Sequence, residues 1–374
     1  MKVQVNSSEL LEALGHIQSI VEKRNAKPIL SNVKISTKKN KMSFYTTDLE
    51  IFAKEVIEAS VAGDLTTTTP IHTFYDVLRK IGSDQKVQLI FEPSEKPVKM
   101  LIKSGLSEFI LPCLSAEEFP DFEEGRHDCE FKISCSDLSY LISATKHAIS
   151  YDDTKYYLNG IFLHVVEDDG VKVLRAVATD VHRLAMAEVT LPSNAALLPE
   201  IILPRKTAVE LLKLIEGYQG DITLGGSPNK ITAIIGNTTL VSKLIDGKFP
   251  DYNKAIPYDN FKVLEASIDQ LSNAIDLVTA ISSEKVKAIK LKIHQSRITL
   301  HANDKISASG TIDIPASYEN EEITTAFNSR YILDILDNLT GEKVVFKLNS
   351  SDRAVLVESG SDSNCKFVLM PLKI

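Results

Sequence analysis

The sequence predicts an α+β protein made of three tandem copies of one domain, each built from two similar halves. Three observations support this prediction. The length of 374 residues suits two or three domains, similar segments recur at nearly equal spacing, and every copy shows a short strand, a helix and then alternating strand patterns. We place the copies at residues 1–126, 127–254 and 255–374, where proline-containing turns separate one unit from the next.

Each copy opens with a short strand, a small polar residue that can cap a helix, and a helix. The three openings are residues 2–11, 131–138 and 261–271. In the third opening, Ser267 and Gln270 have the spacing of a capping box. Leu271, Ile275 and Val278 then follow at helical spacing, which predicts a helix with one apolar face.

A polar turn recurs in phase after the strands that follow each first helix. It is Thr47–Asp48, Thr179–Asp180 and Asn303–Asp304, at offsets of 132 and 124 residues. A second helix then begins the second half, near residues 73–78, 204–212 and 329–336. Each copy is therefore expected to contain two halves of the β-α-β-β-β type. Because the aspartate of the turn recurs in all three copies, we expect Asp180 to have a structural role.

The chain is acidic, with a net charge of −8, and each copy carries −2 or −3. Tight binding of nucleic acid over the whole surface is disfavoured, because such binding uses Lys and Arg to neutralise phosphates. Several cations lie on the predicted helices, among them Arg24, Arg79 and Lys146. They indicate either a positive helix face or ordinary solvated helix surfaces, and the sequence leaves both interpretations open.

Motifs of membrane insertion, secretion and catalysis are missing from the sequence. No segment approaches the ~18 apolar residues of a membrane span, and the polar start disfavours a secretion signal, so we expect a cytosolic protein. The four cysteines form no CxxC pair. There is no GxGxxG, P-loop, GxSxG or HExxH motif. We therefore predict reduced thiols, no cofactor, no metal site and no enzymatic activity.

Four segments carry a resemblance to a known family. They are Tyr156–Gly160, Ala178–Ala185, Ser242–Tyr252 and Val368–Ile374. Together they resemble the beta subunits of bacterial DNA polymerase III, the beta sliding clamps, and the resemblance covers the whole chain. It implies a homodimer joined head to tail. Such a dimer is a ring of six DNA-clamp domains, with helices lining the hole and sheets outside.

The resemblance also implies a function, that of a processivity factor which encircles double-stranded DNA. The expected partners are the DNA polymerase III alpha subunit, the clamp loader, and other polymerases and repair proteins, all bound through short linear motifs. A ring holds DNA by topology, so its inner face needs only enough positive charge to let the duplex slide. The acidic composition is then no obstacle to a role on DNA.

His182 and Arg183 follow the recurring aspartate only in the middle copy. From the residues alone they are either a structural pair or part of a binding site. The resemblance implies a pocket between the second and third domains, where apolar surface takes the motif's anchors and polar groups orient it. The implied lining is Leu158, Thr179, Val181, His182, Arg183, Leu184, Pro250, Lys254, Asn328, Tyr331, Val368, Met370, Pro371 and Leu372.

Three residues depart from the family's pattern at this pocket. Val181 stands where the family usually has Gly, and Lys254 and Ala255 stand where a well-known form of the pocket has Arg and Val. We expect a narrower floor near Val181 and a shallower one near Ala255.

The resemblance implies two further surfaces. Contacts with DNA would come from Arg24, Lys155, Tyr156, Tyr157 and Lys206. The subunit contact would join Phe109 and Leu111 to Ile281 of the other copy. Residues 151–155 are more acidic than a DNA-contacting loop should be, and the two tyrosines read equally well as aromatic residues that start a strand.

Two other functions remain open at this point. One is a hydrolase or transferase that uses Asp180 and His182 as an acid–base pair, although no nucleophile or metal motif accompanies them. The other is a clamp-like scaffold that binds peptides but does not encircle DNA. Retention on circular DNA distinguishes a ring from such a scaffold.

Overall fold

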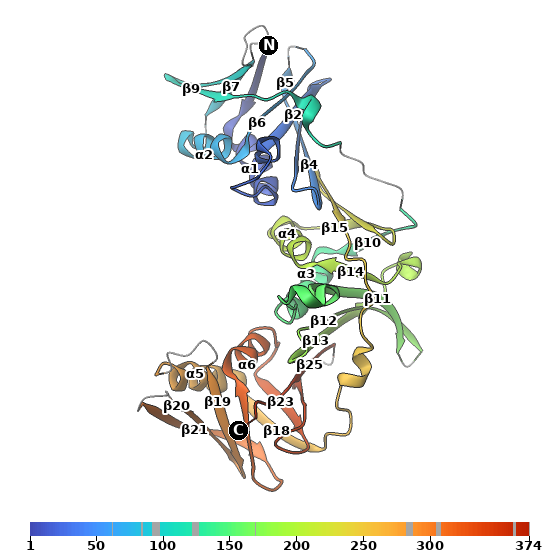
Figure 1. Ribbon diagram of the computed structural model, residues 1–374, viewed down its shortest axis with the longest axis vertical. Coiled ribbons are helices and arrows are strands. Elements are labelled where there is room, and N and C mark those ends of the chain that lie inside the picture. Colours follow the sequence, from blue (N-terminus) through green and yellow to red (C-terminus); the bar gives the residue numbers. More distant parts are fainter. Residues whose placement is uncertain are drawn as a thin grey trace. The chain divides into compact units, whose positions relative to one another are not determined.

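The computed structural model describes residues 1–61, 63–83, 85–91, 98–121, 127–168, 170–281, 287–303, 308–361 and 364–373 (Figure 1). The chain separates into two compact units. The first comprises Met1–Cys135, Pro192–Pro199 and Val209–Leu244, and the second comprises Ser136–Leu191, Glu200–Ala208 and Ile245–Ile374. The predicted boundary near residue 126 lies outside the described residues.

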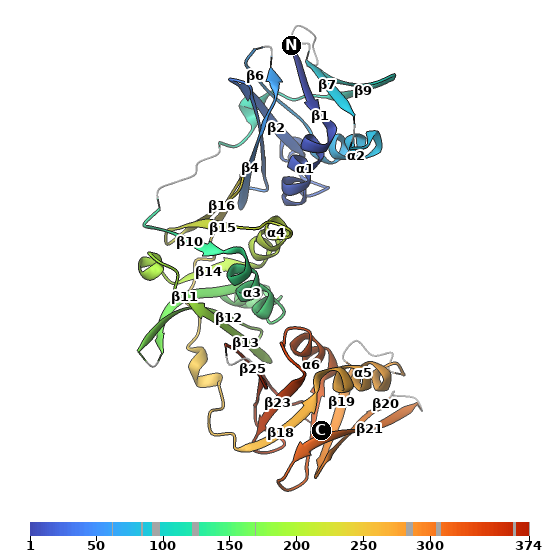
Figure 2. The same ribbon diagram turned by 180° about the vertical axis from the view of Figure 1, so that it is seen from behind.

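The first unit contains two antiparallel sheets and the helices α1 (Ser7–Ile17) and α2 (Ile71–Ile81), which pack side by side (Figures 1 and 2). The five-stranded sheet runs β5 (Ser60–Val61), β1 (Lys2–Asn6), β7 (Lys86–Phe91), β8 (Lys99–Ser104), β9 (Ser107–Pro112). The eight-stranded sheet runs β10 (Cys129–Ser134), β15 (Asp221–Gly226), β16 (Lys230–Ile235), β17 (Thr238–Lys243), β4 (Ile51–Glu58), β3 (Lys41–Thr47), β2 (Asn32–Lys38), β6 (Leu65–Pro70).

The second unit contains one antiparallel sheet of twelve strands, with α5 (Ile268–Thr279) and α6 (Ser329–Leu336) packed together beside it. In order, its strands are β14 (Ile201–Pro204), β11 (Gly160–Asp168), β12 (Val171–Thr179), β13 (Arg183–Thr190), β25 (Cys365–Leu369), β24 (Val355–Ser359), β23 (Lys343–Leu348), β18 (Lys262–Ser267), β21 (Ser309–Tyr318), β20 (Arg297–Asn303), β19 (Ala288–His294) and β22 (Ile323–Asn328). Most of α3 (Cys135–Lys146) belongs to this unit, and α4 (Arg205–Ile215) runs from the second unit into the first.

The predicted repeat is present in the order of the elements. The short strands β1, β10 and β18 precede α1, α3 and α5, and the strands β6, β14 and β22 precede α2, α4 and α6. The predicted cap of the third opening is confirmed, because Ser267 Oγ accepts a hydrogen bond from the Gln270 amide. Leu271, Ile275 and Val278 are buried as their spacing predicts.

Two strand pairings join consecutive copies of the repeat. At the first junction, β4 of the first copy pairs with β17 of the second, with Ile51 opposite Ser242. At the second junction, β13 of the second copy pairs with β25 of the third, with Arg183 opposite Leu369. Each junction therefore continues a sheet from one copy into the next. These two pairings were not predicted from the sequence.

Among the described helices, none is long and apolar enough to cross a membrane. The four cysteines form no disulfide with one another, and Cys113, Cys129 and Cys365 are buried while Cys135 is half-buried. The described residues contain no cluster of three or more His, Cys, Asp or Glu side chains arranged to hold a metal ion.

Candidate partner-binding site at the second junction

The turn between β12 and β13 is built by two side chains. Asp180 Oδ1 accepts hydrogen bonds from the amides of His182 and Arg183, both at 2.9 Å. Thr179 Oγ1 accepts from the Val181 amide at 3.1 Å. The carboxylate and hydroxyl thus satisfy three consecutive backbone donors, as Asx turns do.

The turn of the first copy repeats this geometry. Asp48 Oδ1 accepts from the amides of Glu50 and Ile51 at 3.0 and 2.7 Å, and Thr47 Oγ1 accepts from the Leu49 amide at 2.8 Å. The predicted structural role of the recurring aspartate is confirmed in these two copies. Asp304 of the third copy lies outside the described residues.

The same turn explains why a glycine suits the position of Val181. Val181 has φ +80° and Leu49 has φ +78°. A β-branched side chain strains the backbone in this region, which glycine enters freely. The side chain of Val181 is 53% exposed, so it gains little burial in return.

We expect Val181→Gly to raise the free energy of unfolding by about 1 kcal/mol, because it removes the strain of the positive φ. Chemical denaturation of both proteins measures the difference. Leu49→Gly, at the equivalent turn of the first copy, should shift stability in the same direction. A loss of stability in both variants would show that neither turn is strained.

Arg183 is held inside the protein. Its Nε lies 3.0 Å from Asp180 Oδ2, its Nη1 lies 2.6 Å from Asp334 Oδ2, and its guanidinium stacks 4.1 Å from the centre of the Tyr331 ring. The side chain is only 10% exposed. Asp334 also pairs with Arg330 at 2.8 Å. These contacts join α6 to the start of β13. The guanidinium of Arg183 therefore has a structural role.

We expect Arg183→Ala to destabilise the protein by about 3 kcal/mol, because it leaves two mostly buried carboxylates without their shared cation. Thermal or urea unfolding measures the loss. Arg330→Ala is the matched control, since this exposed arginine pairs with Asp334 from the surface and should cost about 0.5 kcal/mol. An equal, small effect of both changes would contradict the structural role of Arg183.

The predicted lining residues divide by burial. Leu158, Leu184 and Val368 are buried in one apolar cluster with Phe162, Phe249 and other core residues. Val181, His182, Pro250, Lys254 and Met370 are exposed, and Thr179, Asn328, Tyr331, Pro371 and Leu372 are half-buried. The predicted set thus contains a buried base and an exposed rim, rather than a uniformly open lining.

The last residues of the chain are attached to this region by backbone hydrogen bonds. The Met370 amide donates to the His182 carbonyl at 2.9 Å, and the Leu372 amide donates to the Ala326 carbonyl at 2.8 Å. Asn328 Oδ1 caps α6 by accepting from the Arg330 amide at 3.1 Å. The structure therefore gathers the turn after β12, the start of α6 and the chain end in one place.

The residues predicted to contact DNA lie in both units. In the second unit, Tyr156 is exposed and meets Tyr157 edge to face at 5.8 Å. Arg24 is exposed in the first unit. Lys155 and Lys206 are half-buried. Their contact with DNA stays a prediction.

The acidic loop before the tyrosines has a structural explanation. Asp152 Oδ1 accepts from the Thr154 amide at 3.0 Å and from its hydroxyl at 2.6 Å, and these hydrogen bonds lower the pKa of Asp152. Arg205 stacks 3.7 Å from the centre of the Tyr151 ring and donates to the Ser150 carbonyl at 3.0 Å. Arg205, the first residue of α4, is thus a cation in contact with this loop that the predicted DNA residues did not include.

The predicted subunit contact is only partly available at the surface. Phe109 is exposed, but Leu111 is 5% exposed and belongs to the protomer's own core. Ile110, on the opposite face of β9, and Leu106, in the turn before β9, are exposed instead. Ile281 lies against β21, since a Cβ at Gly310 would come 3.5 Å from its Cδ1.

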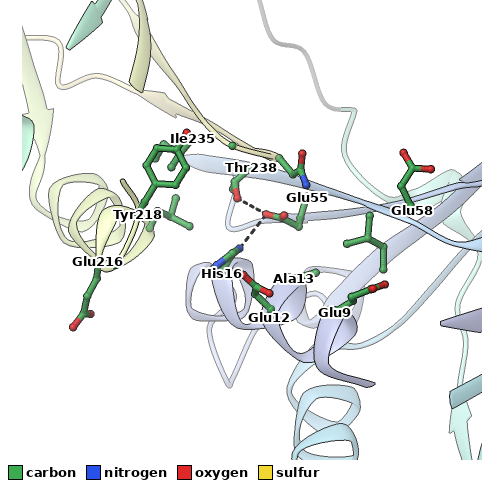
Figure 3. Close-up of a pocket in the computed structure, with 15 residues that line it drawn as sticks. Glu9, Glu12, Ala13, His16, Glu55, Glu58, Glu216, Tyr218, Ile235 and Thr238 are labelled. Atoms are coloured by element: carbon green, nitrogen blue, oxygen red, sulfur yellow. Dashed lines mark hydrogen bonds and ion pairs between the residues drawn. The ribbon is translucent and has the colours of Figure 1, made fainter. Parts of the chain in front are cut away.

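A cavity of about 570 Å³ lies at the first junction and contains none of the predicted site residues (Figure 3). Five glutamates, His16 and Tyr218 are among its lining residues. Buried Glu55 accepts a hydrogen bond from Thr238 across the junction, and His16 Nδ1 lies 3.3 Å from its Oε2 (Figure 3). A second hydrogen bond crosses the junction the other way: buried Glu210 of the second copy accepts a hydrogen bond from Ser19 Oγ of the first. Each copy thus binds a hydroxyl of the other with a buried carboxylate.

We expect the stabilising contribution of His16 to depend on pH. The hydrogen bond with Glu55 raises the pKa of His16; burial opposes the shift, and the charges of Glu55 and Glu12 add to it. A raised pKa means that the contribution is complete below about pH 6.5 and is lost as pH rises through the folded-state pKa. Unfolding free energies of wild type and His16→Gln between pH 5.5 and 8.5 should therefore converge at high pH. Parallel curves would contradict the coupling.

The geometry gives the acid–base hypothesis no support. Asp180 accepts two backbone hydrogen bonds with one oxygen and pairs with Arg183 through the other, so its carboxylate is committed to the turn. The side chain of His182 is exposed at the surface. A general base needs a free lone pair within reach of a substrate proton.

Comparisons with known proteins agree over the whole chain. Three family models match in order, those of the N-terminal, central and C-terminal domains of the DNA polymerase III beta subunit, at residues 1–123, 132–251 and 253–373. The beta sliding clamps of Caulobacter vibrioides and Pseudomonas aeruginosa are 38% and 32% identical, with all of both chains covered.

Solved structures give the same result. A Caulobacter crescentus beta sliding clamp with polyethylene glycol bound has a TM-score of 0.97 at 38% identity, covering 100% of this chain and 99% of that one. A sliding clamp from Bartonella birtlesii bound to griselimycin has a TM-score of 0.96 at 36% identity, with both chains fully covered. The chain therefore belongs to the DNA polymerase III beta subunit family and is a non-catalytic DNA sliding clamp of three tandem clamp domains.

Proposed function

We propose that two copies of the chain join head to tail into a ring that encircles double-stranded DNA and tethers the replicative polymerase to it. The clamp domains are residues 1–126, 127–254 and 255–374, so two copies supply six. The observation that carries this proposal is the repeated strand pairing at the two junctions, which leaves one equivalent pair of strand edges unmatched within a single chain.

The two junctions pair equivalent strands. β4 and β13 are the third strands after the first helix of their copies, and β17 and β25 are the last strands of theirs. The remaining equivalents are β21 and β9. Among the described strands, β9 pairs on one side only, with β8, and residues 309–315 of β21 pair on one side only, with β20. Two copies can pair β9 with β21 twice, which closes the ring and leaves neither of these two edges open at the subunit contact.

Apolar side chains accompany both open edges. Leu106, Phe109 and Ile110 are exposed on or beside β9. On the other side, Leu277 is exposed on α5, and Ile281 lies over β21 at Gly310. Burial of these groups would supply the driving force for association. The proposed contact thus keeps Phe109 and Ile281 from the sequence prediction and replaces Leu111 by Leu106 and Ile110.

The proposed DNA contacts are Arg24, Lys155, Tyr156, Tyr157 and Lys206, all on the inner face of the ring. An acidic chain suits this role, because topology and not affinity retains the duplex. The protein would act in the cytoplasm, where it meets the chromosome and the polymerase.

The proposed partner pocket lies at the second junction, with the exposed rim and buried base described above. Short linear motifs of the DNA polymerase III alpha subunit, the clamp loader and other polymerases and repair proteins would bind there. The gathered turn, helix start and chain end support this, since they combine apolar surface with polar groups. The similar clamp of C. crescentus carries polyethylene glycol in a region described as tethering the beta motif.

Loading onto nicked circular DNA tests the ring. After treatment with clamp loader and ATP, the protein should co-migrate with the circle and be released when a restriction enzyme linearises it. Sizing at micromolar concentration should give twice the chain mass of 41.3 kDa. A monomer that binds motif peptides but is never retained on the circle would instead establish the scaffold function.

A further inference from the structure

We propose that a largely buried polar network of His164, Tyr252, Arg175 and Glu188 positions the segment 249–256, and thereby sets the affinity of the pocket for its partner motif. The inference rests on the proposed pocket, because this segment presents Pro250 and Lys254 to it. None of the four network residues belongs to the predicted lining. They act, on this proposal, as positioning residues.

The segment is held by buried anchors and exposes what lies between them. Phe249, Tyr252 and Ile256 are buried, whereas Pro250 and Lys254 are exposed. The three anchors lie in the same apolar cluster as the pocket base, Leu158, Leu184 and Val368. The depth at which the anchors sit therefore sets the height of the rim above the base.

Three network residues form one row across neighbouring strands. His164 of β11 lies opposite Arg175 of β12, which lies opposite Glu188 of β13. Arg175 Nε donates to Glu188 Oε2 at 2.8 Å. His164 and Arg175 are 6% and 5% exposed. The sheet thus presents a rigid row of polar groups beneath the segment.

Tyr252 connects the segment to this row. Its hydroxyl accepts from Arg175 Nη1 at 3.2 Å and lies 3.0 Å from His164 Nε2. Burial and the charge of Arg175 lower the pKa of His164 to about 4, so the ring is neutral at physiological pH. Arg175 can only donate, so the hydroxyl accepts from Arg175 and shares a second hydrogen bond with Nε2. These two contacts fix the position of the hydroxyl by direction as well as by distance.

An aromatic column ties the second anchor to the same row. The Phe249 ring stacks on Phe162 at 4.8 Å, with 5° between the planes, and Phe162 stacks on His164 at 4.2 Å. His164 therefore contacts the anchor Tyr252 directly and is linked to the anchor Phe249 only through Phe162. A change at the row would move Phe249 and Tyr252 together.

Directionality distinguishes this network from ordinary core packing. Apolar side chains would hold the segment as firmly, but they tolerate small slides, whereas hydrogen bonds lose strength within a few tenths of an ångström. A buried polar network fixes position at a cost wherever it is only partly satisfied, and among the described residues His164 Nδ1 has no hydrogen-bond partner. Here the position that matters is that of Pro250 and Lys254.

The test compares Tyr252 with Tyr258, a second tyrosine nearby in the sequence. Tyr252→Phe removes only the anchoring hydroxyl, and Tyr258→Phe removes the hydroxyl of a tyrosine that is 65% exposed. The dissociation constant of a fluorescent linear-motif peptide from polymerase III should rise about five-fold for Tyr252→Phe and stay unchanged for Tyr258→Phe. Unchanged affinity of folded Tyr252→Phe overturns the proposal. Should Tyr252→Phe not fold, His164→Leu removes the hydroxyl's second hydrogen-bond partner instead and should weaken peptide binding similarly.

A double-mutant cycle separates positioning from general stability. Lys254→Ala should lower the affinity for the peptide in the wild-type background. In the Tyr252→Phe background it should lower the affinity less, because the lysine is already displaced there. Equal effects in both backgrounds overturn the proposal. Failure of the pocket itself gives a different result: wild type then does not bind the peptide, or binds it equally after removal of residues 370–374.

Discussion

Removal of residues 370–374 is expected to abolish binding of the linear-motif peptide, with a loss of at least about 100-fold in affinity. The deletion removes Met370, which is 44% exposed, and the half-buried Pro371 and Leu372 from the proposed rim. The fold should persist, because β25 ends at Leu369 and keeps its pairing with β13 and β24. Fluorescence anisotropy measures the affinity, and sizing checks that the dimer remains. Residue 374 lies outside the described part of the chain.

Lys373→Ala is the matched control for this deletion, since it alters an exposed residue of the same tail that is absent from the predicted lining. It should bind the peptide as wild type does. Undiminished affinity after the deletion would remove the chain end from the pocket. Arg183→Ala is a poorer test than the deletion, because its contacts with Asp180 and Asp334 make lost binding inseparable from lost stability.

Ile110→Asp is expected to convert the dimer into a monomer at micromolar concentration. Ile110 is 63% exposed on an open strand edge, and the proposed contact would bury a carboxylate there without a partner. Such burial costs several kcal/mol, and a ring of two copies contains the contact twice. Light scattering after size exclusion measures the mass, and retention on nicked circular DNA should be lost with the dimer.

Leu197→Asp controls for the change in charge and hydropathy. Leu197 is as exposed as Ile110 and lies outside β9, so this variant should remain dimeric and be retained on the circle. A dimeric Ile110→Asp protein would rule out pairing through β9, whatever the result on DNA.

The subunit contact that the resemblance implies includes Leu111, which the structure buries in the protomer's own core. Leu106, Phe109, Ile110 and Leu111 are all apolar, so the stretch does not alternate cleanly between two faces. A strand's face changes with a shift of one residue, and nothing local decides between the two registers. In the structure Leu111 lies on the buried face of β9, opposite buried Met100 of β8, and Ile110 lies on the exposed face.

The pocket prediction shows the opposite case. Thr179, Asp180 and Val181 form a turn whose hydrogen bonds join residues two or three apart, so the sequence repeat was enough to anticipate it. The partner of Arg183 was not predictable in this way. Asp334 is 151 residues away and meets the guanidinium only after β13 has paired with β25.

The sequence by itself therefore determined what depends on short-range order: three copies, two halves in each, helices with apolar faces, and the recurring aspartate turn. Periodicity and hydrogen bonding between near neighbours encode these features locally. The tertiary structure alone decided which strands join the copies and which side chains surround Arg183 and Tyr252. It also decided that Leu111 is buried in the protomer while Leu106 is exposed at the surface. Such contacts unite residues far apart in the chain, and their energy exists only once the sheets have assembled.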